Sequence, residues 1–145
     1  MEKSLPDTFA IPLGFGRPMR VLLVEDDPDQ AQLAYALVNG CGDGPDLFQI
    51  EWKNNILQAI SRLAKPGIDV VLLDLGMPEL SGCMAHLAIR RVTKKTPVVI
   101  FTSDDSAASQ DITTSQGAFR YLLKNRTSPV ELRQALHEAA FSAPL

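Results

Sequence analysis

The sequence has no stretch that would cross a membrane, only two cysteines and no excess of positive charge. No apolar run approaches the roughly 20 residues that a membrane-spanning helix needs, and the N-terminus lacks the basic start and apolar core of a secretory signal. Lys and Arg total 14 against 17 Asp and Glu, a formal net charge of −3, so no basic field would attract nucleic acid or anionic lipid. Cys41 and Cys83 lack metal-ligand spacing and are expected to be free thiols. We therefore expect a cytoplasmic protein that binds neither nucleic acid nor a membrane directly.

What is present fits one globular domain preceded by a short arm. With 145 residues and 46% hydrophobic residues, the chain is long enough to bury one sizeable core and too short for two. Prolines and glycines are frequent in residues 1–18, so no regular helix or central strand is expected there. We assign residues 1–18 to an N-terminal arm and residues 19–145 to the domain.

The arm carries apolar side chains at every second position: Phe9, Ile11, Leu13 and Phe15. An extended chain would place all four on one side. This pattern favours docking along a sheet edge or helix groove, against a second copy of the chain or against a partner, and it makes a homodimer possible. The alternative is a tail in which the spacing is fortuitous.

From residue 19 onward, apolar strand-like segments alternate with amphipathic ones. The expected strands are 19–24, 47–52, 68–74, 98–101 and 119–123. The expected helices are a segment that Asp27 caps and Asn39-Gly40 ends, one from Asn54 or Asn55 through Ala64, 81–91, 106–116 and one from about residue 128 with Val130, Leu132, Ala135, Leu136 and Ala139 as its inner stripe. Alternation of five strands and five helices predicts an α/β fold, a doubly wound parallel sheet with helices on both faces.

Polar side chains stand where four of these strands end. Glu25 and Asp26 follow the first strand, Asp74 the third, Thr102 the fourth and Lys124 the fifth. Parallel strands bring these ends to one edge of the sheet. Three converging carboxylates repel one another, and a bound Mg²⁺ ion, which prefers oxygen ligands, commonly neutralises such a cluster. An ammonium and a hydroxyl beside it suit a phosphoryl group.

With these residues the sequence resembles the response-regulator receiver domain of two-component signalling, of the single-domain chemotaxis type. The matching segments are VLLVEDDP at 21–28, LLDLGMPELSG at 72–82, VVIFTS at 98–103 and GAFRYLLK at 117–124, and the spacings between Asp74, Thr102 and Lys124 agree with the family. The resemblance implies the flavodoxin-like fold with strand order 2-1-3-4-5.

The resemblance also implies roles for residues at the strand ends. Asp74 would be the phosphoacceptor. Asp26 would bind Mg²⁺ directly, Glu25 largely through water, and Asp74 and the main-chain carbonyl of Gly76 would complete the ligand set. Asp27, the third acid of the first cluster, is assigned to the helix cap and not to the metal.

Thr102 and Lys124 would hold the phosphoryl oxygens, and Tyr121 stands at the family's switch-aromatic position, although it is also plausible as an ordinary strand aromatic. Two positions depart from the family. Ser81 replaces an acidic residue and still suits a helix cap. Asn125 replaces the proline whose bond to the lysine is typically cis, and a non-proline cis bond is costly.

Two functions are compatible with these features. The first is a stand-alone receiver that takes its phosphoryl group from a histidine kinase or a histidine phosphotransfer protein and acts in trans on a downstream protein target. It would catalyse its own phosphorylation and dephosphorylation without being an enzyme for a separate substrate. The second is a binding module that has lost phosphorylation, which the complete set of chemical residues disfavours. A metal-dependent phosphatase is disfavoured because Gly76 stands where a second Asp would be needed.

Overall fold

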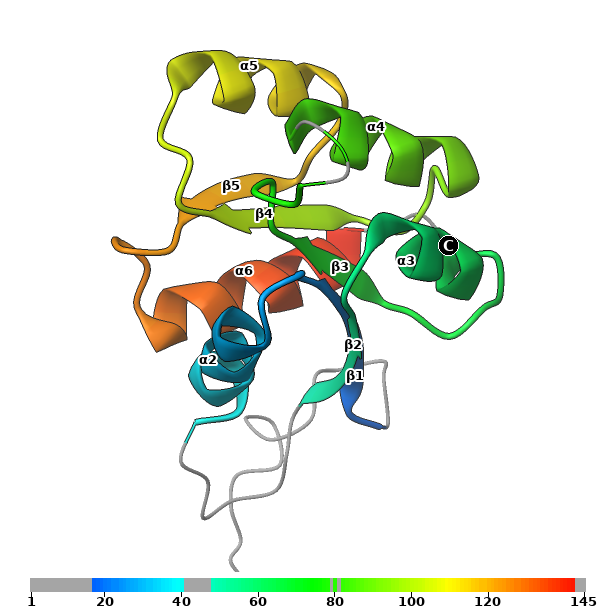
Figure 1. Ribbon diagram of the computed structural model, residues 1–145. Coiled ribbons are helices and arrows are strands. Elements are labelled where there is room, and N and C mark those ends of the chain that lie inside the picture. Colours follow the sequence, from blue (N-terminus) through cyan, green and yellow to red (C-terminus); the bar gives the residue numbers. More distant parts are fainter. Residues whose placement is uncertain (1–16, 41–47, 79, 81, 143–145) are drawn as a thin grey trace, which may run out of the picture.

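The computed structural model describes residues 17–40, 48–78, 80 and 82–142, which form one sheet with helices on both of its faces (Figure 1). The strands are β1 (Met19–Val24), β2 (Phe48–Lys53), β3 (Val70–Leu73), β4 (Val98–Thr102) and β5 (Arg120–Leu123). The helices are α2 (Pro28–Asn39), α3 (Ile56–Leu63), α4 (Gly82–Val92), α5 (Ala107–Ser115) and α6 (Pro129–Ser142). Within these residues we find no helix with the length and apolar character needed to cross a membrane.

The sheet is parallel throughout and has the strand order β2-β1-β3-β4-β5. This confirms the predicted doubly wound, flavodoxin-like fold. Because every strand runs in the same direction, the residues that follow β1, β3, β4 and β5 all emerge at one edge of the sheet.

The predicted ends of the elements agree with the structure at the caps and differ at β3. Asp27 and Asn55 each accept a hydrogen bond from a backbone N–H in the first turn of the helix they precede, as their side chains predict. Ser106, predicted as the first residue of its helix, instead caps α5 and accepts from the Ser109 backbone N–H. Strand β3 spans Val70–Leu73 rather than residues 68–74. Just before it, the Asp69 carboxylate accepts from the Arg20 backbone N–H at 2.8 Å. The predicted cap at Ser81 lies outside the described residues.

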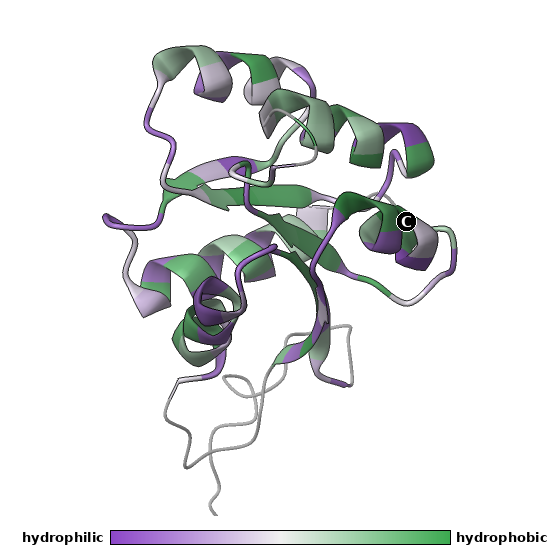
Figure 2. Ribbon diagram, viewed as in Figure 1, coloured by the Kyte–Doolittle hydropathy of each residue, from purple (hydrophilic) through white to green (hydrophobic). Residues whose placement is uncertain are grey.

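Two apolar clusters hold the helices on the sheet. Helices α2 and α6 pack on one face, and α3 and α4 pack on the other. Strands β3 and β4 are buried on both faces, and Figure 2 shows them hydrophobic along their length. This double burial explains why the sequence of these strands is continuously apolar rather than alternating.

One predicted core residue of the last helix is exposed. Leu132, Ala135, Leu136 and Ala139 are buried as predicted, but Val130 is 62% exposed. The physical reason is helical periodicity: Val130 precedes Leu132 by two residues, which turns it about 200° away from the buried stripe.

His86 joins two helices through a buried polar contact. Its side chain has no exposed surface, and its Nδ1 lies 2.9 Å from the Gln116 Oε1 at the end of α5. Burial lowers the pKa of His86 below its usual 6.5, and the nearby Arg90 charge acts in the same direction. The absence of a metal-ligand role for His86 stays a prediction, and its packing role is what the structure describes.

We expect His86 to make the fold sensitive to acid. The unfolded chain protonates this imidazole near pH 6.5 whereas the folded chain does so only at lower pH, so the free energy of unfolding should fall as pH drops below 6.5, by at most about 1.4 kcal/mol per pH unit. Urea denaturation above and below this pH should show a smaller acid loss in His86→Gln than in the wild type. His137→Gln, at an exposed position, is the matched control. An equal acid loss in all three proteins would contradict this prediction.

An ion pair holds Arg17, the first described residue, against the start of β3. Arg17 donates from Nη1 to the Asp69 Oδ2 at 2.8 Å, which holds the start of β1 against the start of β3. The described backbone contains no cis peptide bond, so the Lys124–Asn125 bond is trans. The predicted apolar face of the arm lies outside the described residues.

Candidate functional site

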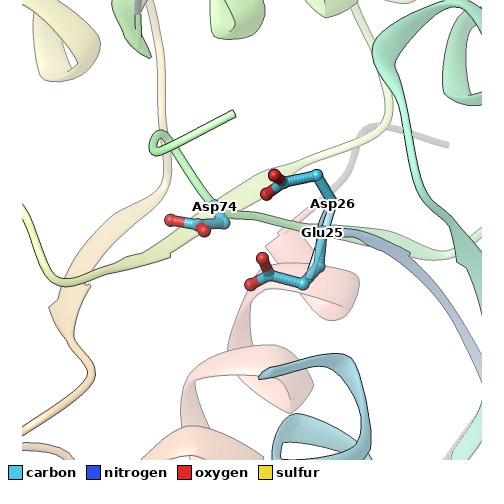
Figure 3. A group of neighbouring side chains, drawn as sticks. All are labelled: Glu25, Asp26 and Asp74. Carbon is cyan, nitrogen blue, oxygen red and sulfur yellow. The ribbon is translucent and has the colours of Figure 1, made fainter. Parts of the chain in front are cut away.

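Three carboxylates meet where β1 and β3 end (Figure 3). Glu25 and Asp26 follow β1 directly and Asp74 follows β3. The two strands are neighbours, with Val24 paired to Leu73, so the three side chains emerge side by side. Each residue offers an oxygen within 4.8 Å of the others. The convergence predicted from the strand ends is therefore present.

Lys124 closes this cluster from the other side. Its Nζ donates to the Glu25 Oε1 at 2.7 Å and to the Asp74 Oδ2 at 3.4 Å. It also donates to the Gln30 Oε1 at 3.1 Å, and it lies 6.0 Å from the centroid of the Phe101 ring, within the range of a cation–π contact. The lysine thus bridges the ends of β1, β3 and β5, with Glu25 as its shortest contact.

The electrostatics of the cluster are unbalanced toward negative charge. Glu25 is 2% exposed and Asp74 9% exposed. Burial raises the pKa of Glu25 to about 7, and the Asp74 charge acts in the same direction, whereas the hydrogen bond from Lys124 lowers it. One ammonium therefore does not fully compensate these buried carboxylates. An all-oxygen donor set with excess negative charge fits a hard divalent cation such as Mg²⁺.

Thr102 and Gly76 frame the cluster, Thr102 as the last residue of β4 and Gly76 in the loop after β3. Thr102 is buried, its Oγ1 accepts from the Asp104 backbone N–H at 3.2 Å, and its carbonyl accepts from the Lys124 backbone N–H at 2.9 Å. The backbone N–H of Gly76 donates to the Asp74 Oδ1 at 3.1 Å. A Cβ at Gly76 would lie 3.5 Å from Asp74 Oδ2, so glycine leaves this side of the carboxylate open.

Tyr121 lies in β5 with its ring partly buried against the α3–α4 side of the sheet. Its hydroxyl donates to the Asp104 carbonyl at 2.6 Å. Burial raises the pKa of this phenol to about 12, and the Asp104 carboxylate adds to the effect. The same loop therefore receives a hydrogen bond from Tyr121 and donates one to Thr102, which places these two residues in one hydrogen-bond network.

Sequence reasoning missed Gln30 and Trp52. Gln30 lies in the first turn of α2 and accepts from the Lys124 ammonium at 3.1 Å, a contact between residues too far apart in sequence for a local pattern to predict. Trp52 donates from Nε1 to the Glu25 carbonyl at 2.7 Å, and no local signal announces this contact because β2 and β1 are far apart in sequence. Asp27 stays outside the cluster, and its Oδ1 accepts from the Asp29 N–H at 2.9 Å, which confirms its assignment to the cap.

Comparison with known proteins matches the family model for the response regulator receiver domain to residues 21–137. The chain is 33% identical to the swarming motility regulation protein RssB of Serratia marcescens over 73% of this chain and 46% of that protein. It is 29% identical to the transcriptional regulatory protein ZraR of Klebsiella oxytoca over 75% of this chain and 24% of that protein. The chain thus spans less than half the length of these relatives.

Solved structures share the fold. A CheY-like response regulator receiver domain protein from Methanospirillum hungatei has a TM-score of 0.73 at 16% identity and covers 86% of this chain and 95% of its own. A LuxR-family two-component response regulator from an Aurantimonas species has a TM-score of 0.74 at 24% identity, with 87% of each chain covered. At these identities the solved structures support the fold alone. The acidic cluster of Glu25, Asp26 and Asp74 independently supports a metal site.

Proposed function

Because this chain belongs to the family of response regulator receiver domains, we propose that it takes a phosphoryl group onto Asp74 from the phosphohistidine of a histidine kinase or a histidine phosphotransfer protein. The observation that carries this proposal is the position of the Asp74 carboxylate, which lies among two further acids and 3.4 Å from the Lys124 ammonium. The phosphorylated protein would signal through contacts with a downstream protein target. Such an exchange with a kinase is consistent with a cytoplasmic location.

The residues around Asp74 suit an in-line transfer. An Asp74 carboxylate oxygen would form a bond to phosphorus while the phosphorus–nitrogen bond of phosphohistidine breaks, and the imidazole leaves with the electron pair. The hydrogen bond from the Gly76 N–H to Oδ1 orients the carboxylate. Lys124 and the Thr102 hydroxyl would then bind the phosphoryl oxygens, whose new charge they stabilise. The same groups would assist water in removing the phosphoryl group.

The acidic cluster would hold Mg²⁺. Asp26 and Asp74 would bind it directly, Glu25 largely through water, and the Gly76 carbonyl would supply a further oxygen. When bound, the ion would neutralise the carboxylates and the incoming phosphoryl oxygens. The alternative of a binding module without phosphorylation is disfavoured, because the Asp74 carboxylate and the Lys124 ammonium lie 3.4 Å apart and Thr102 ends the neighbouring strand β4.

The proposed function is tested by phosphorylation from a small donor. The full chain incubated with Mg²⁺ and acetyl phosphate should gain the mass of one phosphoryl group, measured on the intact protein. Fragmentation after borohydride reduction should locate the modification at Asp74, because the acyl phosphate is reduced there to the alcohol. No mass gain under conditions that phosphorylate a known receiver would overturn the proposal, as would modification at another residue.

We expect Asp26→Ala to weaken Mg²⁺ binding more than Glu25→Ala does. A ligand bound directly to the ion contributes more to affinity than one that acts through water. We expect a loss of Mg²⁺ affinity of about tenfold in Asp26→Ala and of roughly a few-fold in Glu25→Ala. Calorimetric titration of each variant measures this. Asp29→Ala, an exposed acid in the first turn of α2, controls for the general loss of negative charge. Equal losses in the two cluster variants would contradict the ranking.

We expect phosphorylation to change the surface formed by α5, β5 and α6. The added charge should draw Thr102 and Lys124 toward the phosphoryl group, which breaks the hydrogen bond from the Asp104 N–H to Thr102 and shifts the loop that Tyr121 holds. Beryllofluoride with Mg²⁺, a phosphoryl mimic, should therefore move NMR resonances on that surface. Tyr121→Phe keeps the ring and should reduce the shifts in the loop. Unchanged resonances across α5 and β5 would refute this switch.

A further inference from the structure

An apolar groove lies between α2 and the edge strand β2. Leu23 and Ile50 form its floor, and Ala31, Tyr35 and Trp52 form its walls, around about 480 Å³ of space. Tyr35 is 48% exposed and Trp52 43% exposed. We call this feature the α2–β2 groove.

The groove exists because helix α2 covers only part of β2. Phe48, Ile50 and Trp52 are alternate residues of the strand and face the same side of the sheet. Phe48 at the start of the strand is 5% exposed, Ile50 is half-buried and Trp52 is 43% exposed. Within the described residues β2 is an edge strand that pairs only with β1. No other described strand lies beside it, and the Trp52 side chain stays partly exposed to solvent. An exposed apolar feature of this kind marks a binding surface.

The sequence before the described residues contains an apolar segment that is long enough to reach this groove. The described residues begin at Arg17, which Asp69 holds at 2.8 Å, and Met19 pairs with Phe48 in the sheet register. The arm therefore joins the domain level with the start of β2. From there Trp52 is about 13 Å along the strand, while residues 9–15 span up to about 20 Å when extended. Their four large apolar side chains alternate with Ala10, Pro12 and Gly14.

We propose that residues 9–15 of the same chain bind in the α2–β2 groove, with Phe9, Ile11, Leu13 and Phe15 on the side that faces it. The tether of residues 16–18 keeps this segment at an effective concentration in the millimolar range, which favours the chain's own arm over the arm of a second copy. Trp52 also donates to the Glu25 carbonyl. A segment in the groove would therefore contact a side chain that directly supports the acidic cluster.

Trp52 is the only tryptophan of the chain, so the tryptophan fluorescence comes entirely from a residue that lines the groove. We expect deletion of residues 2–16 to shift its emission to longer wavelength and to make acrylamide quenching about twice as efficient, since 43% of its surface is open in the described fold. Ile11→Asp in the full chain should have the same effect. Ala10→Asp, the matched control, places the same charge on the opposite side of the segment and should leave emission and quenching unchanged.

Two outcomes would overturn the proposal. The first is identical Trp52 emission and quenching in the full chain, the deletion variant and Ile11→Asp. The second is a protection of Trp52 that disappears on dilution, together with a dimer in light scattering, which would show that a second copy supplies the arm. Protection that is independent of concentration in a monomer supports the proposal. Circular dichroism of each variant verifies that the domain is folded, since all the changes lie before β1.

Discussion

Asp74→Asn should abolish phosphoryl uptake while leaving the fold intact. Asparagine is nearly isosteric with aspartate but its amide is not a nucleophile toward phosphorus, so no acyl phosphate can form. The Gly76 N–H can still donate to the amide oxygen as it does to Oδ1 at 3.1 Å. Intact mass after incubation with Mg²⁺ and acetyl phosphate should show no gain. This is the largest single effect that we expect from one substitution in the chain.

The stability of Asp74→Asn provides the internal check. Removing one of three converging carboxylates relieves repulsion with Glu25, so the urea midpoint of the variant should not fall below that of the wild type. Asp105→Asn, an exposed acid in the loop after β4, should retain full uptake and serves as the matched control. Phosphoryl uptake at another residue of the Asp74→Asn protein would contradict the assignment of the acceptor.

Lys124→Met should destabilise the metal-free protein by on the order of 2–4 kcal/mol. The methionine keeps most of the apolar stem, but the buried Glu25 and Asp74 carboxylates lose the ammonium that lies 2.7 Å and 3.4 Å away. Uncompensated buried charge is the costly part of a broken buried pair. Urea denaturation without divalent cations measures the loss. The exposed Lys95 provides the control, because Lys95→Met should change stability by less than about 0.5 kcal/mol.

Mg²⁺ should restore part of the stability that Lys124→Met loses. A divalent cation among the carboxylates replaces the missing positive charge, so the variant should gain more stability from added Mg²⁺ than the wild type gains. Sodium chloride at the same ionic strength separates specific binding from screening. If Lys124→Met and Lys95→Met were equally stable, the ammonium would not hold the cluster together.

The sequence by itself determined the fold class and most of the site. Continuous apolar runs at 70–73 and 98–101 required strands buried on both faces, because only such strands carry no polar face. Caps such as Asp27 placed the helix starts, because their side chains accept from the first free N–H groups. The parallel direction then brought Glu25, Asp74 and Lys124 to one edge without any further information.

Only the tertiary structure decided which of these groups touch. Lys124 lies nearer to Glu25 than to Asp74, Gln30 joins the same ammonium and the Trp52 indole binds the Glu25 carbonyl. Local periodicity specifies the face on which a side chain lies, but the distance between groups on different strands depends on sheet register, helix placement and rotamers. The exposure of Trp52 has the same origin, since it depends on how far α2 extends over a strand that lies far from it in sequence.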